Sequence, residues 1–403
     1  MQNHRQINRL KNTVQGILDE AAKQGASAAE AGLSQENGLS VSVRLGDVET
    51  IEHHCDQGLG VTVYFGKRKG SASTTDLSQA SIKETVSAAC SIARYTSEDE
   101  FSGLPEQELL ATEFPDLELN HPWDAGVDGS IALAIECEDA ARSYHAEISN
   151  SEGASVDTHQ GIRVMGNSLG FLQGYASTRH SLSCSVLAQR GDSMQRDYWY
   201  TVARNALNLE SAVDVGNKAA ERTLRRLQAR SLSTRQCPVL YCAETASGLL
   251  SSFIGAISGG NLYRKSSFLL DALDTQVFPE FVRIHEEPFL KGALGSGAYD
   301  GEGVDHVEVA RGQVRKHLCA QPVVAVLLEH LVDLAPPDPL LGAALAGDEL
   351  VAGRAARVPA GVDDERAAVG QDSLVTPQRV RVEDRRRGVP PDRALRLEPV
   401  RDG

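Results

Sequence analysis

Alternating runs of polar and apolar residues constrain the fold of this 403-residue chain more than any other feature. Leu39, Val41 and Val43 alternate with polar residues, and Gly46-Asp47 follows as a turn. Later runs of the same kind, punctuated by glycine, asparagine and aspartate, cover 58–64, 161–165, 170–176, 180–188 and 197–201. The pattern predicts short antiparallel strands, repeated about every ten residues.

Helices are predicted where apolar residues recur at steps of three and four. This spacing covers about 5–24, 127–146 and 209–230. A further helix, which carries Ile82 and Val86, is predicted to have Asp76 as its N-cap. The helix at 209–230 places Arg222, Arg225 and Arg226 on a solvated outer face. Residues 97–124 are acidic and contain three prolines, which indicates an irregular connection.

Helices combined with antiparallel strands predict an α+β protein, α/β in the broad sense, of two domains. We place an N-terminal helix and antiparallel-sheet domain at residues 1–205 and a second, sheet-rich domain at 206–318. His180 lies in one of the strand runs without a nucleophile elbow nearby, so we expect a half-exposed sheet histidine rather than a catalytic one.

Charge and cysteine content bear on partners and compartment. A net charge of −15 argues against nucleic acid or an anionic membrane as the main partner. The N-terminus has no secretory signal pattern and no run approaches the length of a membrane span, so a cytoplasmic protein is expected. The seven cysteines are odd in number and scattered, which favours free thiols over a disulfide framework.

The stretch from Cys237 to Leu270 is the part of the sequence that bears most on a catalytic function. Residues 238–241 predict a strand, residues 243–248 a turn, and the apolar segment from Leu249 to Ile257 a buried helix. Glu244 is the one carboxylate in the turn.

This stretch resembles the segment that holds the metal in the TldD/PmbA family of metallopeptidases (peptidase U62, modulators of DNA gyrase), where metal-binding members have His-Glu-x-x-x-His. The strings GKRKGSASTTDL at 66–77, YRKSSFL at 263–269 and YDGEGV at 299–304 continue the resemblance. The two histidine positions fall on Ala243 and Gly248, and the glutamate position on Glu244. Neither alanine nor glycine binds zinc, and a catalytic zinc needs about three protein ligands. We therefore predict no catalytic, cofactor-binding or metal-binding residue, and interpret Glu244 as an acid at a helix N-terminus.

The resemblance implies the PmbA branch, also called TldE. It implies a zinc-free subunit of a cytoplasmic heterodimeric metallopeptidase that processes unfolded or short peptides, with zinc held only by a TldD-type partner. Two alternatives stay open. One is an autonomous zinc metalloprotease with unrecognised ligands, and the other is a peptide-binding or regulatory scaffold without proteolysis.

The resemblance ends at about Leu318. Residues 317–403 contain no Lys, Tyr, Phe, Trp, Ile, Asn or Met, although aromatic residues normally carry much of a core. We expect residues 319–403 to be an atypical, disordered tail, and we interpret it as a frame-shift product or a degenerate end.

Overall fold

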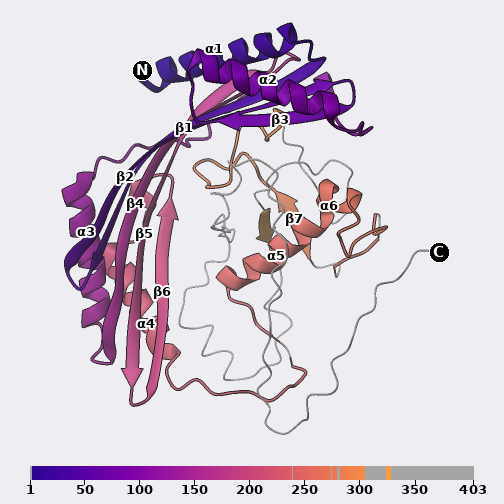
Figure 1. The fold of residues 1–403 in the computed structure, drawn as a ribbon. Coiled ribbons are helices and arrows are strands. Elements are labelled where there is room, and N and C mark those ends of the chain that lie inside the picture. The colour runs from indigo at the N-terminus through magenta and orange to yellow at the C-terminus, as the bar shows by residue number, and fades with distance from the viewer. Residues whose placement is uncertain (1, 238, 274, 279–281, 305–323, 328–403) are drawn as a thin grey trace, which may run out of the picture. The chain divides into compact units, whose positions relative to one another are not determined.

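The computed structural model describes residues 2–237, 239–273, 275–278, 282–304 and 324–327. Its main element is a six-stranded antiparallel sheet in the order β3-β2-β1-β4-β5-β6, which curls along its length (Figure 1). The strands are β1 (Ala28–Arg44), β2 (Asp47–Phe65), β3 (Arg68–Thr74), β4 (Ile148–Asn167), β5 (Leu172–Arg190) and β6 (Ser193–Ala203). Helices and antiparallel strands confirm the predicted α+β class.

The strands are longer than the sequence pattern predicts. The runs 170–176 and 180–188, expected as two strands, fall almost entirely within the single strand β5, and residues 161–165 are the end part of β4. The prediction of short strands is wrong because β4 and β5 pair along nearly their whole length, so internal serines and glycines do not break them. The first hairpin turn occupies Leu45 and Gly46, both with positive φ, one residue earlier than predicted.

Four helices cover one face of the sheet. They are α1 (Gln2–Lys23), α2 (Gln79–Tyr95), α3 (Gly126–Ser143) and α4 (Ala212–Arg225), and they confirm the helices predicted from spacing. The helices α1 and α2 pack over one end of the strands and α3 and α4 over the other (Figure 1). Each pair closes its own apolar cluster, so a single curled sheet supports two cores.

The N-cap of α2 differs from the prediction. Ser78, not Asp76, is the capping residue, because its extended backbone lets the Ser78 Oγ accept the N–H of Ser81 at 3.3 Å. Asp76 instead accepts hydrogen bonds from the N–H and the hydroxyl of Ser78, at 2.9 and 3.0 Å. The predicted acid therefore orients the cap rather than forming it.

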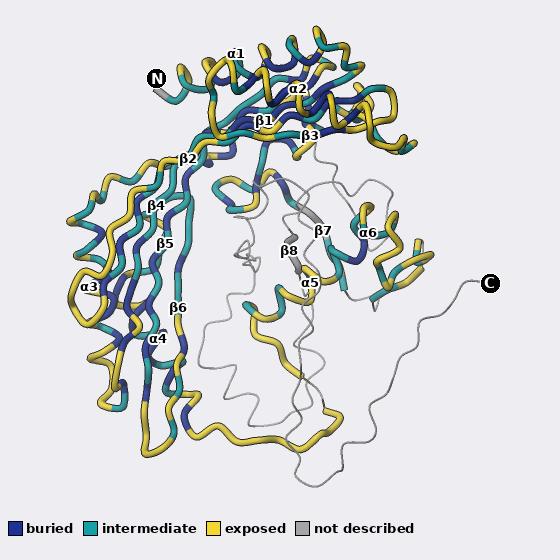
Figure 2. The backbone as a smooth tube through the Cα atoms, in the orientation of Figure 1, coloured by how far each residue is buried: buried dark blue, intermediate teal, exposed yellow. Residues whose placement is uncertain are grey.

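The sheet face away from these helices is polar. Burial alternates along β1 and β5, as Figure 2 shows by colour, and the residues between the core positions point to the opposite face. We call this face the polar face. Its members on the three central strands include Ser34, Glu36, Gly38, Ser40, Ser42, Asp157, His159, Gly161, Arg163, Ser177, Arg179, Ser181 and Ser183.

One end of the polar face is covered. Tyr299 and Phe171 pack with Met165 and Tyr175, together with Leu117 and neighbouring apolar residues of the 110–119 connection. The rings of Tyr299 and Phe171 meet edge to face at 5.0 Å between centroids. Residues 299–304, part of the resemblance noted above, thus lie against the sheet, and Leu110 forms a β-bridge with Val304.

Beyond residue 227 the described elements are short. They are α5 (Ala243–Ile257), α6 (Gly259–Tyr263), β7 (Arg283–Glu286) and β8 (Val324–Leu327), the last two forming an antiparallel pair. Residues 239–241 form no strand, and in α5 only Ala256 and Ile257 are buried. The predicted strand and buried helix are therefore wrong for the described residues, because the rest of this apolar stretch is only partly covered and Leu249 is 53% exposed.

Two further expectations concern the C-terminal tail and membrane-spanning helices. The predicted atypical tail at 319–403 lies outside the described residues, apart from 324–327. None of the helices that the structure describes is long and apolar enough to cross a membrane.

Candidate functional site

The N-terminus of α5 is where the sequence places the degenerate metal motif. Cys242 is its N-cap, Ala243 its first residue, and Glu244 lies in its first turn. Gly248 follows one turn later, with no atom within 4 Å of the place where a side chain would begin. The helix thus has room for a larger residue at 248, but Ala243 and Gly248 offer no ligand atom to a metal.

Glu244 is engaged by an arginine of the neighbouring helix α4. The Nη1 of Arg222 donates to the Oε1 of Glu244 at 3.2 Å, and both side chains are about one third exposed. Partial burial alone would raise the pKa of Glu244, but hydrogen bonds from its own backbone N–H and from Cys242, and the charge of Arg222, outweigh it. The pKa of Glu244 therefore lies below its ordinary value, the opposite of what a general base near neutral pH needs.

Arg222 is itself held on several sides. Its guanidinium lies over the ring of Trp199 at 5.0 Å, and its Nε is 3.8 Å from the Oδ2 of the buried Asp197. Arg226 reaches the same Asp197 oxygen at 3.3 Å. Two of the arginines predicted on a solvated face of this helix, Arg222 and Arg226, thus form ion pairs with Asp197. The ion pair between Arg222 and Glu244 connects this network to α5.

A catalytic zinc, which the family resemblance brings into question, does not fit these residues. Within the residues that the structure describes, no group of three His, Cys, Asp or Glu side chains is placed to hold a metal ion. Cys237 and Cys242 are both exposed, and the Sγ of Cys242 lies 3.2 Å from the Oγ1 of Thr245 rather than beside a histidine.

His180 does not have the environment predicted for it. It is 1% exposed rather than half-exposed, because the connection at 121–123 covers β5 at this point. Its Nε2 lies 2.9 Å from the carbonyl oxygen of His121 and must donate there, so Nδ1 accepts from the hydroxyl of Thr158 at 2.8 Å. Burial lowers the pKa of His180. Both nitrogens of the neutral His180 imidazole are thus hydrogen-bonded, and the side chain is a structural part of the core.

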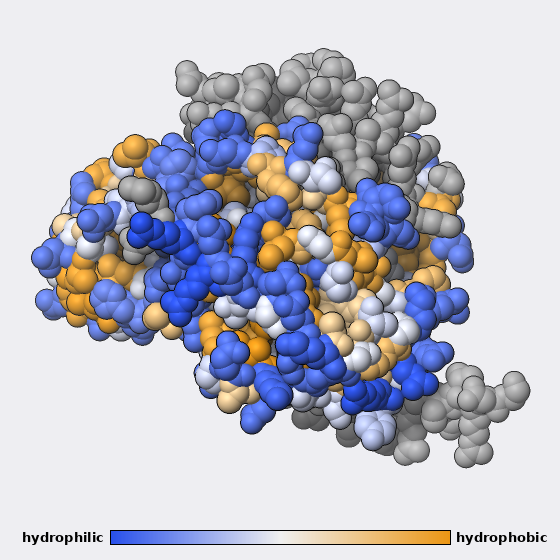
Figure 3. All heavy atoms as spheres, turned by 90° about the horizontal axis from the view of Figure 1, so that it is seen from above, coloured by the Kyte–Doolittle hydropathy of each residue, from blue (hydrophilic) through white to orange (hydrophobic). Residues whose placement is uncertain are grey.

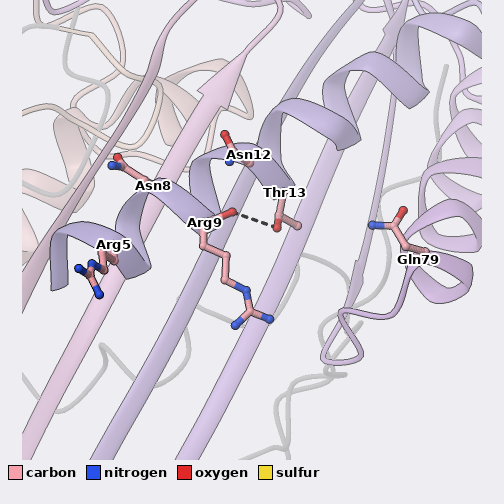
Figure 4. Close-up of a pocket in the computed structure, with 6 residues that line it drawn as sticks. All are labelled: Arg5, Asn8, Arg9, Asn12, Thr13 and Gln79. Atoms are coloured by element: carbon pink, nitrogen blue, oxygen red, sulfur yellow. Dashed lines mark hydrogen bonds between the residues drawn. The ribbon is translucent and has the colours of Figure 1, made fainter. Parts of the chain in front are cut away.

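An open hollow of about 560 Å³ lies along the outer face of α1 (Figure 4). Its lining consists of Arg5, Asn8, Arg9, Asn12, Thr13 and, from α2, Gln79. The Thr13 hydroxyl donates to the carbonyl of Arg9 at 3.3 Å, so it is not free for other chemistry. Without a carboxylate, histidine or cysteine in its lining, this hollow offers neither a base nor a metal ligand. The surface seen from above, over α1 and α2, mixes hydrophilic residues with smaller hydrophobic areas (Figure 3).

The sequence shows which residues stand at 243, 244 and 248, but it gives no sign of the partners of Glu244. Nothing in the spacing of α4 says that Arg222, rather than Arg225 or Arg226, meets Glu244. Arg225 pairs with Glu221 one turn away on the same helix, a pairing that i, i+4 spacing does indicate.

Three domain descriptions of one family match the chain. The description "PmbA/TldA metallopeptidase domain 1" matches residues 29–93, the central domain residues 120–227, and the C-terminal domain residues 234–311. Together they include all of the six-stranded sheet's central strands and the helix α5.

Curated proteins of similar sequence carry the name of the same family. Metalloprotease PmbA of Escherichia coli O157:H7 is 48% identical over 285 residues, which are 71% of this chain and 63% of that protein. The Metalloprotease PmbA homolog of Haemophilus influenzae is 46% identical over 295 residues, 73% of this chain and 65% of that protein. The chain thus spans less than two thirds of the length of these relatives.

Solved structures share the fold. A protein of Bacteroides thetaiotaomicron described as a modulator of DNA gyrase superposes with a TM-score of 0.72 at 24% identity, covering 79% of this chain and 77% of that one. TldE from Thermococcus kodakarensis gives a TM-score of 0.59 at 17% identity, with 75% and 69% covered. At these identities the likeness concerns the fold alone.

Proposed function

The chain belongs to the PmbA/TldD metallopeptidase family, and from this we propose that it is a TldE-type subunit. Such a chain carries no catalytic zinc of its own and pairs in the cytoplasm with a zinc-bearing TldD-type subunit. The substrates of the pair are unfolded or short peptides. Because the chain spans less than two thirds of its curated relatives, activity, partner and substrate are all parts of this proposal.

The observation that carries the proposal is the chemistry at the start of α5. Ala243 and Gly248 stand where zinc-binding members of the family have histidines, and methyl and hydrogen groups cannot replace two imidazole ligands. The retained Glu244 is paired with Arg222 and has a lowered pKa, so it is poorly suited to take a proton from water.

In such a pair, this chain's residues bind and position the substrate rather than break its bonds. The polar face of the sheet provides hydroxyl, imidazole and guanidinium groups that suit the polar backbone and side chains of a peptide. The resemblance to TldE from Thermococcus kodakarensis supports the branch only through the fold.

The test is the zinc content of the purified chain, measured by elemental analysis alone and after reconstitution with a TldD-type subunit. Cleavage of a casein-derived peptide mixture is followed in the same samples by mass spectrometry. We expect negligible zinc and no cleavage by the isolated chain, and both zinc and cleavage in the reconstituted sample.

Other results point to the other functions. Near-stoichiometric zinc with cleavage in the isolated chain would establish an autonomous metalloprotease with ligands elsewhere. A complex that forms without any increase in cleavage over the TldD-type subunit alone would indicate a non-proteolytic scaffold.

A further inference from the structure

A row of three cationic or potentially cationic side chains crosses the polar face. His54 on β2 and His159 on β4 are both register partners of Gly38 on β1, and His159 is in turn the partner of Arg179 on β5. Cross-strand partners share one face of a sheet. Because neighbouring strands lie about 4.8 Å apart, the row extends roughly 14 Å from His54 to Arg179.

Gly38 lets the two histidines come together. Their rings stack at 6.2 Å between centroids, and a Cβ at residue 38 would lie 2.8 Å from the Nδ1 of His159. The imidazole of His159 therefore lies across the glycine. Around the row the polar face carries serines and glycines, such as Gly161, Ser177 and Ser181, so a bound chain meets few bulky side chains beside Arg179. The carboxylates nearby are Glu36, Asp157 and Glu52, and Glu52 lies 3.8 Å from the Nε2 of His54.

Arg179 is unusual among the arginines of the sheet. Arg163 lies 3.9 Å from Glu36, Arg196 lies 2.6 Å from Glu152, and Arg190 pairs with Glu147. Arg179 is half-buried, yet among the residues that the structure describes its guanidinium has no hydrogen-bond or ion-pair partner. A guanidinium presents five donors in a planar fork that matches a carboxylate.

Tyr200 on β6 lies on the same face of the sheet as the row, because it is the register partner of Ser183. Burial raises the pKa of Tyr200 on β6; among the neighbouring charges, Glu244 raises it further and Arg179 lowers it. The ring of Tyr200 stacks with the ring of Tyr198, with 6.2 Å between their centroids.

We propose that Arg179, beside the His54–His159 pair, binds carboxylate groups of an extended peptide on the polar face, and that acidic peptides are therefore the preferred ligand class. This proposal rests on the proposed function, which makes peptides the ligands. Charge complementarity at Arg179 selects the occupant: a guanidinium without an ion-pair partner among the described residues favours an anion at that place, and the serines and glycines of the polar face fit an extended backbone. The covered end, at Tyr175 and Tyr299, limits the surface on one side.

The experiment is isothermal titration calorimetry of the full chain, without a TldD-type subunit, at pH 7 and low salt. Three unlabelled decapeptides of glycine and serine are compared: one with two internal glutamates and an amidated C-terminus, one with glutamines in their place, and the glutamine peptide with a free C-terminal carboxylate. Binding is measured for the natural chain and for Arg179→Gln, Arg179→Lys and Arg196→Gln.

We expect the glutamate peptide to bind about tenfold more tightly than the amidated glutamine peptide, as one charge-assisted pair provides. Arg179→Gln removes that preference and Arg179→Lys keeps part of it. Arg196→Gln, which changes the same charge at an arginine already paired with Glu152, keeps all of it. Thermal unfolding of each variant shows that it is folded.

The third peptide separates the two sources of carboxylate. Preference for the glutamine peptide with a free C-terminus, in place of the glutamate peptide, would show that Arg179 binds chain ends. Equal affinities for all three peptides, no binding of any, or an unchanged preference in Arg179→Gln would overturn the proposal. None of these results depends on zinc content or cleavage, so the proposed function can fail independently.

Discussion

The carboxylate of Glu138 on α3 accepts a hydrogen bond from the backbone N–H of Gly46, at 2.8 Å from its Oε2, at the tip of the hairpin that joins β1 and β2. Its other oxygen accepts the N–H of Leu45, also at 2.8 Å. Glu138 is completely buried, and both turn residues have positive φ. One acidic side chain therefore satisfies two backbone donors of a strained turn and ties the helix to the sheet.

Removal of this carboxylate should destabilise the protein substantially. Glu138→Ala removes the acceptor of two turn donors and creates a cavity where the buried carboxylate was, so we expect a loss of about 2–5 kcal/mol in the free energy of unfolding, measured by urea denaturation. Glu138→Gln keeps the volume and one acceptor and should lose less, about 1–3 kcal/mol. Equal stability of both variants and the natural chain would mean that the turn does not need Glu138.

Loss of the ion pair between Glu244 and Arg222 should have a weak effect on stability and no effect on peptide cleavage. Glu244→Gln should change the free energy of unfolding by less than about 1 kcal/mol, because the pair is partly solvated and screened. In a sample reconstituted with a TldD-type subunit, the same variant should cleave peptides at the natural rate. A loss of cleavage by two orders of magnitude, with the complex intact, would instead give Glu244 a catalytic role.

The helix α2 packs so closely on β3 that Gly70 has no room for a side chain. A Cβ at this position would overlap the backbone of Ala89 and Ala93, which cannot move aside as a flexible side chain can. Gly70→Ala should therefore destabilise the protein by about 3 kcal/mol, measured by thermal and urea unfolding. Gly60→Ala is the matched control, since nothing lies within 4 Å of a Cβ there; it should leave stability unchanged or raise it by about 0.4–1 kcal/mol.

His180 predicts a dependence of stability on pH. Burial lowers its pKa in the folded protein below the ordinary value of 6.5, although the hydrogen bond to the His121 carbonyl opposes the shift. Below pH 6.5 the unfolded chain takes up a proton that folded His180 does not, so stability is full above this pH and falls as the pH drops towards the folded-state pKa. We expect urea midpoints between pH 8 and 5 to fall more steeply for the natural chain than for His180→Gln. His4→Gln, at an exposed position, should keep the natural slope.

The sequence determined the elements that depend on local spacing. Apolar residues at helical steps gave α1, α3 and α4 within a few residues, because each of these helices buries one face against the sheet. Alternation gave the strand segments and the antiparallel class. The strings shared with the family located the degenerate motif, since residue identity at 243, 244 and 248 is read directly from the sequence.

Tertiary structure decided what local pattern does not encode. The separate runs joined into β5 because β4 pairs with it across the intervening residues. The helix expected to be buried at 249–257 is buried only at Ala256 and Ile257, because burial depends on distant residues. His180 became a core residue through the connection at 121–123, and Arg222 became the partner of Glu244, through contacts between residues far apart in the chain. Spacing fixes which face of an element a residue occupies, whereas only the assembled fold fixes what lies opposite that face.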